Sequence, residues 1–490
     1  MNDRHDLELV LQSRIPLVAL ETREERRAME LLRELAVRNG LPLFRWTLTE
    51  GLVSVVHGLG LQEETREPAA MLQQIKQQQR EGIYVLVDFH PWLGEPLHVR
   101  LLKDIAIAYE QHGQTLVLLS HDLDIPPELA HYCATLSLSL PDQAKIAAIV
   151  RDTAADWSRS HGGRKVRADR EALARLERHL AGLTLAEARR LAKRAIHDDG
   201  AITGDDIPRL LQAKYALLNR EGVLQYEYET ERFAGLGGFA RLREWLVQRR
   251  RSFYEDDGVL DRPRGILLLG VQGCGKSLAA RAVAGEWGLP LLRLDAGALF
   301  NKYHGETERN LRETLKAAGA MAPCVLWIDE IEKGFSVSGS DGGTSQRVLG
   351  TLLTWMAENR APVFLVATAN DITALPPELV RKGRLDEIFF VDLPDLSARR
   401  DIFAIHLRRR RQDPAHFALA ELARRCAGFS GAEIEQVVVS ALYSARAREQ
   451  ALSDEQLQEA IRQTRPLSVI MAEKIEALRE WAEDRTVNAN

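Results

Sequence analysis

Two stretches of the sequence carry side chains suited to holding a chain of phosphates. The first, residues 270–277, reads G-V-Q-G-C-G-K-S and follows directly on the apolar run GILLLG. Glycines let backbone N–H groups close on a phosphate that side chains would keep away. Lys276 adds a point charge for the β and γ phosphates, and the Ser277 hydroxyl is a hard oxygen ligand suited to Mg²⁺. We expect this loop to bind ATP with Mg²⁺.

Strong helix formers, LAARAVAGEWG, follow the loop at residues 278–288. The loop therefore opens a helix whose positive end faces the anion, and the order strand, loop, helix is the context that this motif requires. The residues expected to contact the nucleotide here are Gly270, Gln272, Gly273, Cys274, Gly275, Lys276, Ser277 and Leu278.

The second stretch is the buried-strand pattern CVLWI, which ends in an acidic pair 53 residues after Lys276. Asp329 is expected to hold Mg²⁺ together with Ser277, and Glu330 to orient and deprotonate the attacking water. A third apolar run, residues 363–369, delivers Asn370, whose amide would hold that water or sense the γ-phosphate. The predicted chemistry is ATP hydrolysis.

Arg381 and Arg384 flank a turn that follows the sequence PPEL at residues 376–379. They are well placed to cross a subunit boundary and neutralise transition-state charge, as arginine fingers do. A solvated pair in a loop is the alternative for two such arginines on their own.

The composition of the 490-residue chain is ordinary for a globular protein, with 45% hydrophobic and 28% charged residues. The net charge of -5 provides no global attraction for nucleic acid. The four cysteines lack C-x-x-C spacing, which predicts neither a cysteine metal site nor a disulfide framework. The N-terminal residues form no apolar leader, and no uncharged stretch approaches the roughly 18 residues of a membrane span. We expect a cytoplasmic protein, or a stromal one if it is plastid-encoded.

The first half of the chain repeats the strand and helix order of the second. The sequence PPEL occurs at residues 126–129 and again at 376–379. The pattern G-x-[ST]-x-x-E, with a capping box that starts a helix, occurs at residues 182–187 and 428–433. We therefore expect two related units, each an α/β sheet with a helical lid.

The catalytic residues are missing from the first of these units. Where the phosphate loop belongs, residues 21–27 read ETREERR, without glycine or lysine. Asp88 parallels Asp329 and is interpreted as a strand-end cap, while Phe89 replaces the catalytic glutamate. We expect a degenerate unit that does not hydrolyse ATP. The alternative for this half is a receiver-like or other doubly wound α/β domain.

Two further segments complete the organisation of the chain. The alternating aromatic and polar residues at 225–229 predict a short strand or an extended linker, and residues 467–484 predict a C-terminal helix with Ile470 and Ile475 on its apolar face. The expected domains are a degenerate α/β domain (1–141), a first helical lid (142–213), a linker (214–234), an active α/β ATPase domain (235–395), a second helical lid (396–465) and a C-terminal helix with its tail (466–490).

Residues 235–465 resemble an AAA module of the classical subgroup. The resemblance rests on the motifs above, on GLGG at residues 235–238 and on the lid motif GFSGAE at residues 428–433. It implies a P-loop AAA+ fold, with a parallel sheet flanked by helices and a helical lid, preceded here by the degenerate unit. It also implies that Arg381 and Arg384 act on a neighbour's ATP, in a homo-oligomeric ring that is usually hexameric.

The same resemblance assigns residues beyond the phosphate loop. The family's adenine pocket falls on Ile402 and His406, although a satisfied surface histidine is the alternative for His406. Gly237, Gly431 and Ala432 complete the nucleotide contacts that the resemblance implies. Because Ala432 stands where other AAA proteins place an arginine, the lid lacks that sensor.

Residues 301–308, NKYHGETE, resemble the first pore loop of AAA remodellers. In those proteins an aromatic residue faces the central channel. The matching residues here are Lys302, Tyr303, His304 and Gly305. An aromatic side chain can grip a polypeptide of any sequence through packing area, and packing of Tyr303 on its own helix is the alternative. The Gly/Ser-rich segment 334–345 stands where the second pore loop is expected.

The runs LLRLDAGALFNKYHGETERNLRETLK and CVLWIDEIEKGF are more particular than the general AAA signature. They resemble an AAA ATPase family known from an open reading frame of algal chloroplast genomes, with cyanobacterial and other bacterial relatives, and the resemblance covers nearly the whole chain. We expect a ring that remodels a protein substrate. An ATP-gated regulatory or scaffolding switch is the alternative. The acidic net charge and the lack of a basic and aromatic stripe disfavour a nucleic-acid motor.

Overall fold

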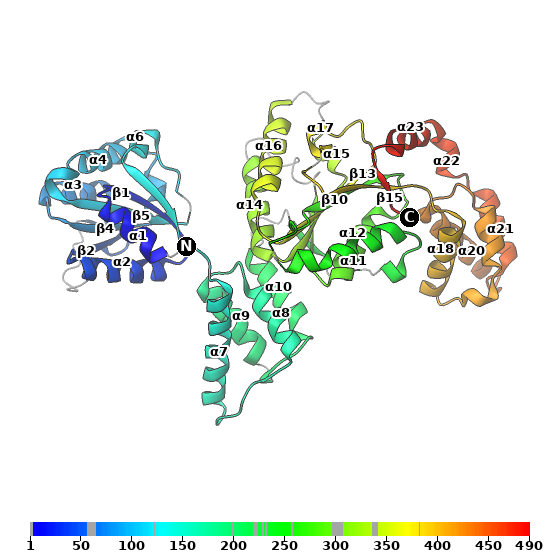
Figure 1. The fold of residues 1–490 in the computed structure, drawn as a ribbon, viewed down its shortest axis with the longest axis horizontal. Coiled ribbons are helices and arrows are strands. Elements are labelled where there is room, and N and C mark those ends of the chain that lie inside the picture. Colours follow the sequence, from blue (N-terminus) through cyan, green and yellow to red (C-terminus); the bar gives the residue numbers. More distant parts are fainter. Residues whose placement is uncertain are drawn as a thin grey trace. The chain divides into compact units, whose positions relative to one another are not determined.

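The computed structural model describes residues 3–55, 65–121, 123–197, 199–218, 224–227, 230, 233–255, 258–295, 307–335, 342–381 and 383–490. The chain divides into two compact units, residues 1–162 with 183–194 and residues 163–182 with 195–490. Each unit contains one large sheet covered by helices on both faces (Figure 1).

The first unit contains a six-stranded sheet in the order β3-β2-β4-β5-β1-β6. Its strands are β1 (Leu17–Glu21), β2 (Leu43–Thr47), β3 (Gly51–Ser54), β4 (Gly82–Val87), β5 (Gln114–Ser120) and β6 (Cys133–Ser137). All neighbours are parallel except the edge strand β3, which is antiparallel to β2. A receiver-like sheet has its second parallel strand beside the first. Here β4 and β5 separate β2 from β1, so the receiver-like alternative is wrong.

Helices cover both faces of this first sheet because its strands are apolar on both sides. Helices α1 (Asp3–Gln12) and α2 (Glu25–Asn39) pack on one face, and α3 (Pro68–Gln78) and α4 (Pro96–Ile107) pack on the other. Other helices described in this unit are η2 (His90–Trp92), α5 (Tyr109–His112), α6 (Pro127–Ala130), α7 (Gln143–Ser160) and most of α9 (Leu185–His197).

The second unit contains a seven-stranded sheet in the order β15-β14-β10-β13-β12-β11-β9. Its strands are β9 (Leu224–Glu227), β10 (Gly265–Gly270), β11 (Leu291–Asp295), β12 (Cys324–Asp329), β13 (Val363–Ala369), β14 (Glu387–Val391) and β15 (Val487–Asn488). Its five central strands follow the same order as the five parallel strands of the first sheet, and antiparallel β9 lies beside β11 as β3 lies beside β2. The predicted repeat of the α/β fold is confirmed, and residues 225–227 of the segment 225–229 lie in strand β9.

Two helices on each face bury the second sheet. Helices α11 (Ala240–Tyr254) and α12 (Lys276–Trp287) cover one face, and α14 (Thr307–Met321) and α16 (Gly342–Glu358) cover the other. Strand β10 is buried along its whole length, which matches its uninterrupted apolar sequence. Short helices α15 (Ile331–Phe335) and α17 (Pro377–Val380) follow β12 and β13 along the chain.

Four helices form the predicted second lid around an apolar core of their own. They are α18 (Leu396–Arg409), α19 (Leu419–Arg425), α20 (Gly431–Ala447) and α21 (Asp454–Gln463). Ser430 and Glu433 make the capping box that starts α20. Thr184 and Glu187 make the corresponding reciprocal bonds at the start of α9 (Leu185–His197), so both predicted capping boxes are confirmed.

The C-terminal helix differs from its prediction. It is broken into α22 (Leu467–Ile470) and α23 (Ala472–Glu483), because Met471 between them leaves the helical conformation at φ -119° and ψ 33°. Ile475 is buried as expected, whereas Ile470 is 67% exposed. The spacing of apolar residues was continuous in sequence, but the break turns Ile470 away from the core.

Before its large sheet begins, the sequence of the second unit forms α8 (Arg170–Leu180), α10 (Asp206–Leu218) and the small strand pair β7 (Arg167–Ala168) and β8 (Ala201–Ile202). The buried ammonium of Lys214 on α10 donates to the carbonyls of His179 and Ala181, 2.8 and 2.7 Å away, at the end of α8. These bonds satisfy carbonyls that a helix end leaves without partners. Within the described ranges, every helix is too short or too polar to traverse a lipid bilayer.

Candidate active site

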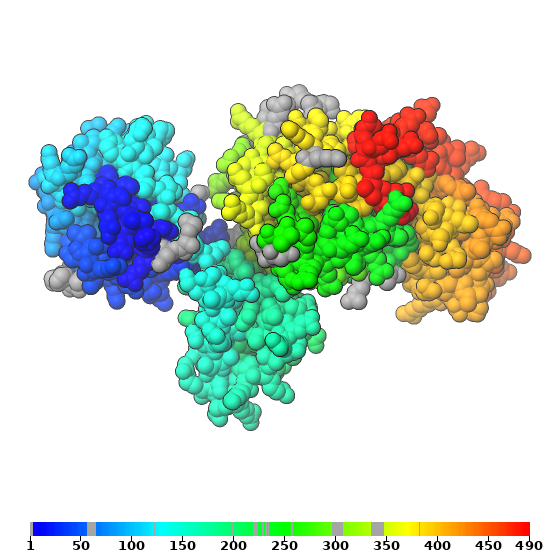
Figure 2. Space-filling model, in the orientation of Figure 1, coloured from blue at the N-terminus to red at the C-terminus, as the bar shows by residue number. Residues whose placement is uncertain are grey.

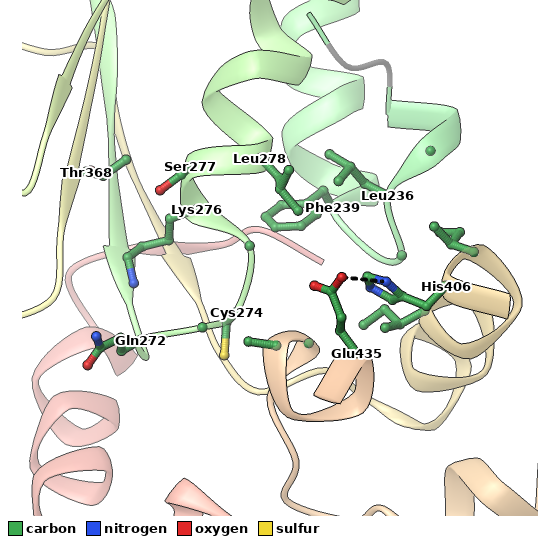
Figure 3. Close-up of a pocket in the computed structure, with 18 of the residues that line it drawn as sticks. Leu236, Phe239, Gln272, Cys274, Lys276, Ser277, Leu278, Thr368, His406 and Glu435 are labelled. Carbon is green, nitrogen blue, oxygen red and sulfur yellow. Dashed lines mark ion pairs between the residues drawn. The ribbon is translucent and has the colours of Figure 1, made fainter. Parts of the chain in front are cut away.

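A cavity of about 360 Å³ lies between the second sheet, the start of α12 and the lid (Figure 3). It brings together most of the residues predicted from the sequence to bind and hydrolyse a nucleotide. Those lining it are Gly237, Gln272, Gly273, Cys274, Gly275, Lys276, Ser277, Leu278, Asp329, Glu330, Asn370, Ile402, His406, Gly431 and Ala432. Segments almost 200 residues apart in sequence thus meet at one site.

The glycines of the loop are required by its backbone and its surroundings. Gly273 and Gly275 have φ values of +79° and +90°, a region that residues with side chains rarely adopt. Gly270 does not line the cavity. A Cβ atom there would lie 2.0 Å from the carbonyl oxygen of Val391, so only glycine fits.

Lys276 begins α12 directly after this loop and is largely buried. Its ammonium donates to the carbonyl oxygens of Gly270 and Val271, 2.8 and 2.9 Å away. Burial lowers the pKa of Lys276 to about 8, and the nearby carboxylates oppose this shift only in part. The loop therefore holds a cation that lacks a full counter-charge.

One hydroxyl joins the two acids of the pair. Thr368 on β13 donates to Oδ1 of Asp329 at 2.7 Å and accepts from the backbone N–H of Glu330 at 3.0 Å. The same Oδ1 of Asp329 lies 3.5 Å from the hydroxyl of Ser277, and Oδ2 pairs with the guanidinium of Arg293 at 3.0 Å. Both oxygens of Asp329 are thereby oriented.

Glu330 stands at a sharp turn of the backbone, with φ +48°. Its Oε1 accepts from the side-chain amide of Asn370 at 3.0 Å, and its Oε2 forms an ion pair with Lys333. The backbone N–H of Asn370 donates to Glu332 at 2.9 Å. Burial raises the pKa of the Glu332 carboxyl. The predicted neighbours Glu330 and Asn370 are thus in direct contact.

Sequence reasoning missed three residues of this network: Arg293, Thr368 and Glu332. A charge inside the apolar strand LLRLD was the available signal for Arg293, whose guanidinium lies 4.8 Å from the centre of the Trp327 ring. Thr368 had no signal, because threonine is common in strands. Glu332 follows the acidic pair and resembled an ordinary acid of a first helical turn.

The lid side of the cavity carries the predicted adenine residues. His406 is only 7% exposed, and its Nδ1 lies 3.5 Å from a carboxylate oxygen of Glu435 (Figure 3). It is therefore not a surface histidine, and burial lowers its pKa. A Cβ atom on Gly237 would lie 2.8 Å from Ile402, so the glycine permits this close approach. Gly273 accepts from the N–H of Ala432 at 3.1 Å, which ties the lid to the phosphate loop.

The paired arginines lie outside this cavity. Arg384 donates to the carbonyl oxygen of Leu353 at 2.7 Å. Arg381 is exposed and lines a different hollow of about 590 Å³ with Trp481 and Arg485. Figure 2 shows the red segment that includes α23 against the yellow segment that includes α17. The pore-loop residues 302–305 and residues 336–341 of segment 334–345 lie outside the described residues.

The first unit has a different arrangement at the place of the phosphate loop. There Oε1 of Glu24 accepts from the backbone N–H of Leu185 at 2.7 Å, so a carboxylate occupies the start of α9. The strand ends also correct the prediction that Asp88 occupies the position equivalent to Asp329. Strand β4 ends at Val87, and Asp88 has φ +53°, so Asp88 corresponds to Glu330.

Comparison with known proteins covers both units. Residues 3–138 match a family model described as the N-terminal domain of SpoVK-like AAA ATPases, and residues 144–221 match the model of their second domain. Residues 266–393 match the AAA family, ATPases associated with various cellular activities, and residues 416–459 match the AAA+ lid domain.

Whole proteins extend this similarity over the full chain. The uncharacterized AAA domain-containing protein ycf46 of Pyropia yezoensis is 35% identical over 100% of both chains. The ycf46 protein of Trieres chinensis is 34% identical over 98% of this chain and 97% of its own. The proteasome-activating nucleotidase of Aeropyrum pernix is 38% identical over 38% of this chain and 47% of its own. The chain therefore belongs to the AAA ATPases and, over its whole length, to their ycf46 group.

Proposed function

We propose that this ATPase works as a ring, most simply a hexamer, that remodels a protein substrate. Each ATP would be hydrolysed in the cavity of one subunit with an arginine of the next. The observation that carries this proposal is the position of Arg381, which is exposed and lines a hollow apart from the cavity of its own chain. An arginine finger acts on phosphates, so a role for Arg381 requires a neighbouring chain.

The donor set at the phosphate end of the cavity fits Mg²⁺. Ser277 offers a hydroxyl oxygen and Asp329 a carboxylate oxygen, 3.5 Å apart, and both are the hard ligands that this ion takes. Mg²⁺ bound with the nucleotide would neutralise charge on the phosphates. Thr368 and Arg293 hold the Asp329 carboxylate in the orientation that keeps Oδ1 beside Ser277.

Glu330 is the residue that we assign to the attacking water. Asn370 fixes one oxygen of its carboxylate, and each oxygen retains a further lone pair for a water proton. The other oxygen of this carboxylate forms an ion pair with Lys333, and a carboxylate beside the water can act as its general base. The roles of Gln272, Cys274, Ile402 and His406 are contacts to the phosphates and the base.

The proposed work on a protein substrate rests on Tyr303 and on the similarity of the ATPase module. One similar protein is named a proteasome-activating nucleotidase. Tyr303 would grip an extended polypeptide in the channel, since aromatic packing requires no particular sequence. The location of the protein in the cytoplasm or in a plastid stroma remains a prediction.

Mixing two inactive variants tests the shared site. A subunit with Arg381→Ala can still bind ATP in its own cavity but supplies no arginine to its neighbour. A subunit with Lys276→Ala has a disabled ATP cavity but still supplies Arg381 to its neighbour. Loss of an arginine finger lowers kcat by roughly 10³-fold or more. Each variant alone is therefore expected to be nearly inactive, and an equal, randomly assembled mixture to recover about a quarter of the wild-type rate.

Arg485→Ala is the matched control, because Arg485 lines the same hollow as Arg381. It should retain wild-type turnover. The shared site is contradicted if the ATPase rate of the mixture equals only the sum of the rates of the two variants. It is also contradicted if Arg381→Ala alone hydrolyses ATP at the wild-type rate.

Replacing Tyr303 separates remodelling from an ATP-gated switch. Tyr303→Ala should keep ATP turnover within about threefold of wild type, because it alters only packing area in the channel. It should lose the ATP-dependent unfolding of a fluorescent reporter that carries an unstructured tail, and Tyr303→Phe should retain it. Equal unfolding by wild type and Tyr303→Ala, or none by wild type, would favour the switch.

The lowered pKa of Lys276 predicts a link between nucleotide binding and protons. A bound phosphate favours the ammonium form, so binding raises this pKa from about 8. Proton uptake on binding ADP should therefore rise from a small fraction of a proton at about pH 7 to nearly one at about pH 9, while affinity falls. Calorimetry in buffers of different ionisation enthalpy measures this uptake.

Lys276→Arg is the control for this measurement, because a guanidinium stays protonated across the whole range. The variant should show no uptake of this kind. Identical uptake in wild type and Lys276→Arg would assign the proton to another group.

A further inference from the structure

Three side chains that bind metals in other proteins meet at the carboxyl edge of the first sheet. Asp88 follows β4, His121 follows β5, and His90 begins η2. One possible ligand atom from each lies within 4.8 Å of the others. Donors on one ion at about 2.1 Å lie about 3.4 Å apart, so modest rotations would bring these side chains onto one ion. Asp88 and His121 are exposed, and the rings of His90 and His121 already lie with their centres 5.1 Å apart.

A serine hydroxyl already orders two of these side chains. Ser120 donates to Oδ1 of Asp88 at 3.4 Å, and its oxygen lies 2.8 Å from Nδ1 of His90. In the tautomer with its proton on Nδ1, His90 donates to the Ser120 oxygen and leaves the hydroxyl proton for Asp88. Nε2 of His90 then has the lone pair that a metal needs.

We propose that Asp88, His90 and His121 bind a divalent transition-metal ion, with Zn²⁺ as the first candidate. Imidazole nitrogen suits Zn²⁺ and its neighbours in the first transition row, whereas Mg²⁺ takes oxygen ligands. Two neutral imidazoles and one carboxylate leave at least one position of a tetrahedral ion open. His90 also lines a hollow of about 710 Å³, so one ligand of the proposed ion borders space that water or a small molecule can enter.

The place of the cluster in the fold supports this assignment. Ligands of α/β sheets bind outside the carboxyl ends of the strands. Asp88 occupies the position that Glu330 has in the second unit, and both have positive φ. His121 follows β5 as Asn370 follows β13. The first unit lacks the lysine and the glycines of the phosphate loop, but it retains the strand ends that present side chains to a ligand. The proposal does not depend on the ring or on ATP hydrolysis.

Cobalt provides a direct test on the full chain, purified without a histidine tag and stripped of metal. Titration with Co²⁺ under saturating Mg²⁺ and ADP, which fill the nucleotide site, should give visible d–d bands that saturate at one ion per chain. Zn²⁺ should abolish these bands by displacement. His90→Ala and His121→Ala should each weaken binding more than about tenfold, and Ser120→Ala should weaken it by about tenfold through loss of orientation.

His131→Ala is the matched control, because His131 is an exposed histidine of the same unit outside the cluster. It should bind Co²⁺ as wild type does. Equal ADP affinity and circular dichroism spectra would show that the variants are folded. Absence of saturable Co²⁺ and Zn²⁺ binding by wild type, or unchanged binding by folded His90→Ala and His121→Ala, would overturn the proposal.

Discussion

The site depends on the way in which β12 ends. Glu330 turns the backbone into the left-handed region, a conformation that costs about 1–3 kcal/mol for a residue with a side chain. Its N–H leaves the strand ladder at that point and would be unsatisfied without the hydroxyl of Thr368. The same hydroxyl holds Asp329. One side chain on β13 therefore fixes both acids, and the nucleotide residues of α12 and the lid are arranged around them.

The two halves of the chain show what this strand end can support. In the first unit the N–H of Asp88 donates to the carbonyl oxygen of Leu119 at 2.9 Å, and no threonine hydroxyl is needed. The turn is retained, but the residues presented there are an aspartate and two histidines instead of a glutamate and an asparagine. The fold thus preserves a position for ligands while the chemistry at that position differs between the two halves.

Much of this architecture was predictable from the sequence, because the residues that carry chemistry follow apolar runs. Lys276, Asp329, Glu330 and Asn370 each follow or end such a run, and parallel strands bring their carboxyl ends to one edge. The repeated PPEL and capping-box patterns predicted the second α/β unit.

Other features depended on tertiary contacts that sequence patterns do not encode. The hydroxyl of Thr368 looks like any strand threonine until β12 lies beside it. The sequence comparison matched Asp88 to Asp329, one position before its true equivalent Glu330, because apolar runs do not define strand ends to a single residue. The predicted C-terminal helix breaks at Met471, although its apolar spacing is continuous.

The most direct test of the account is a single-turnover measurement on Glu330→Gln. Glutamine has nearly the same shape as glutamate but does not act as a base. The account predicts ATP affinity within about threefold of wild type and a hydrolysis rate lower by about 10²-fold or more. Hydrolysis at the wild-type rate would contradict it, because the residue held by Asn370 would then not be the group that activates water.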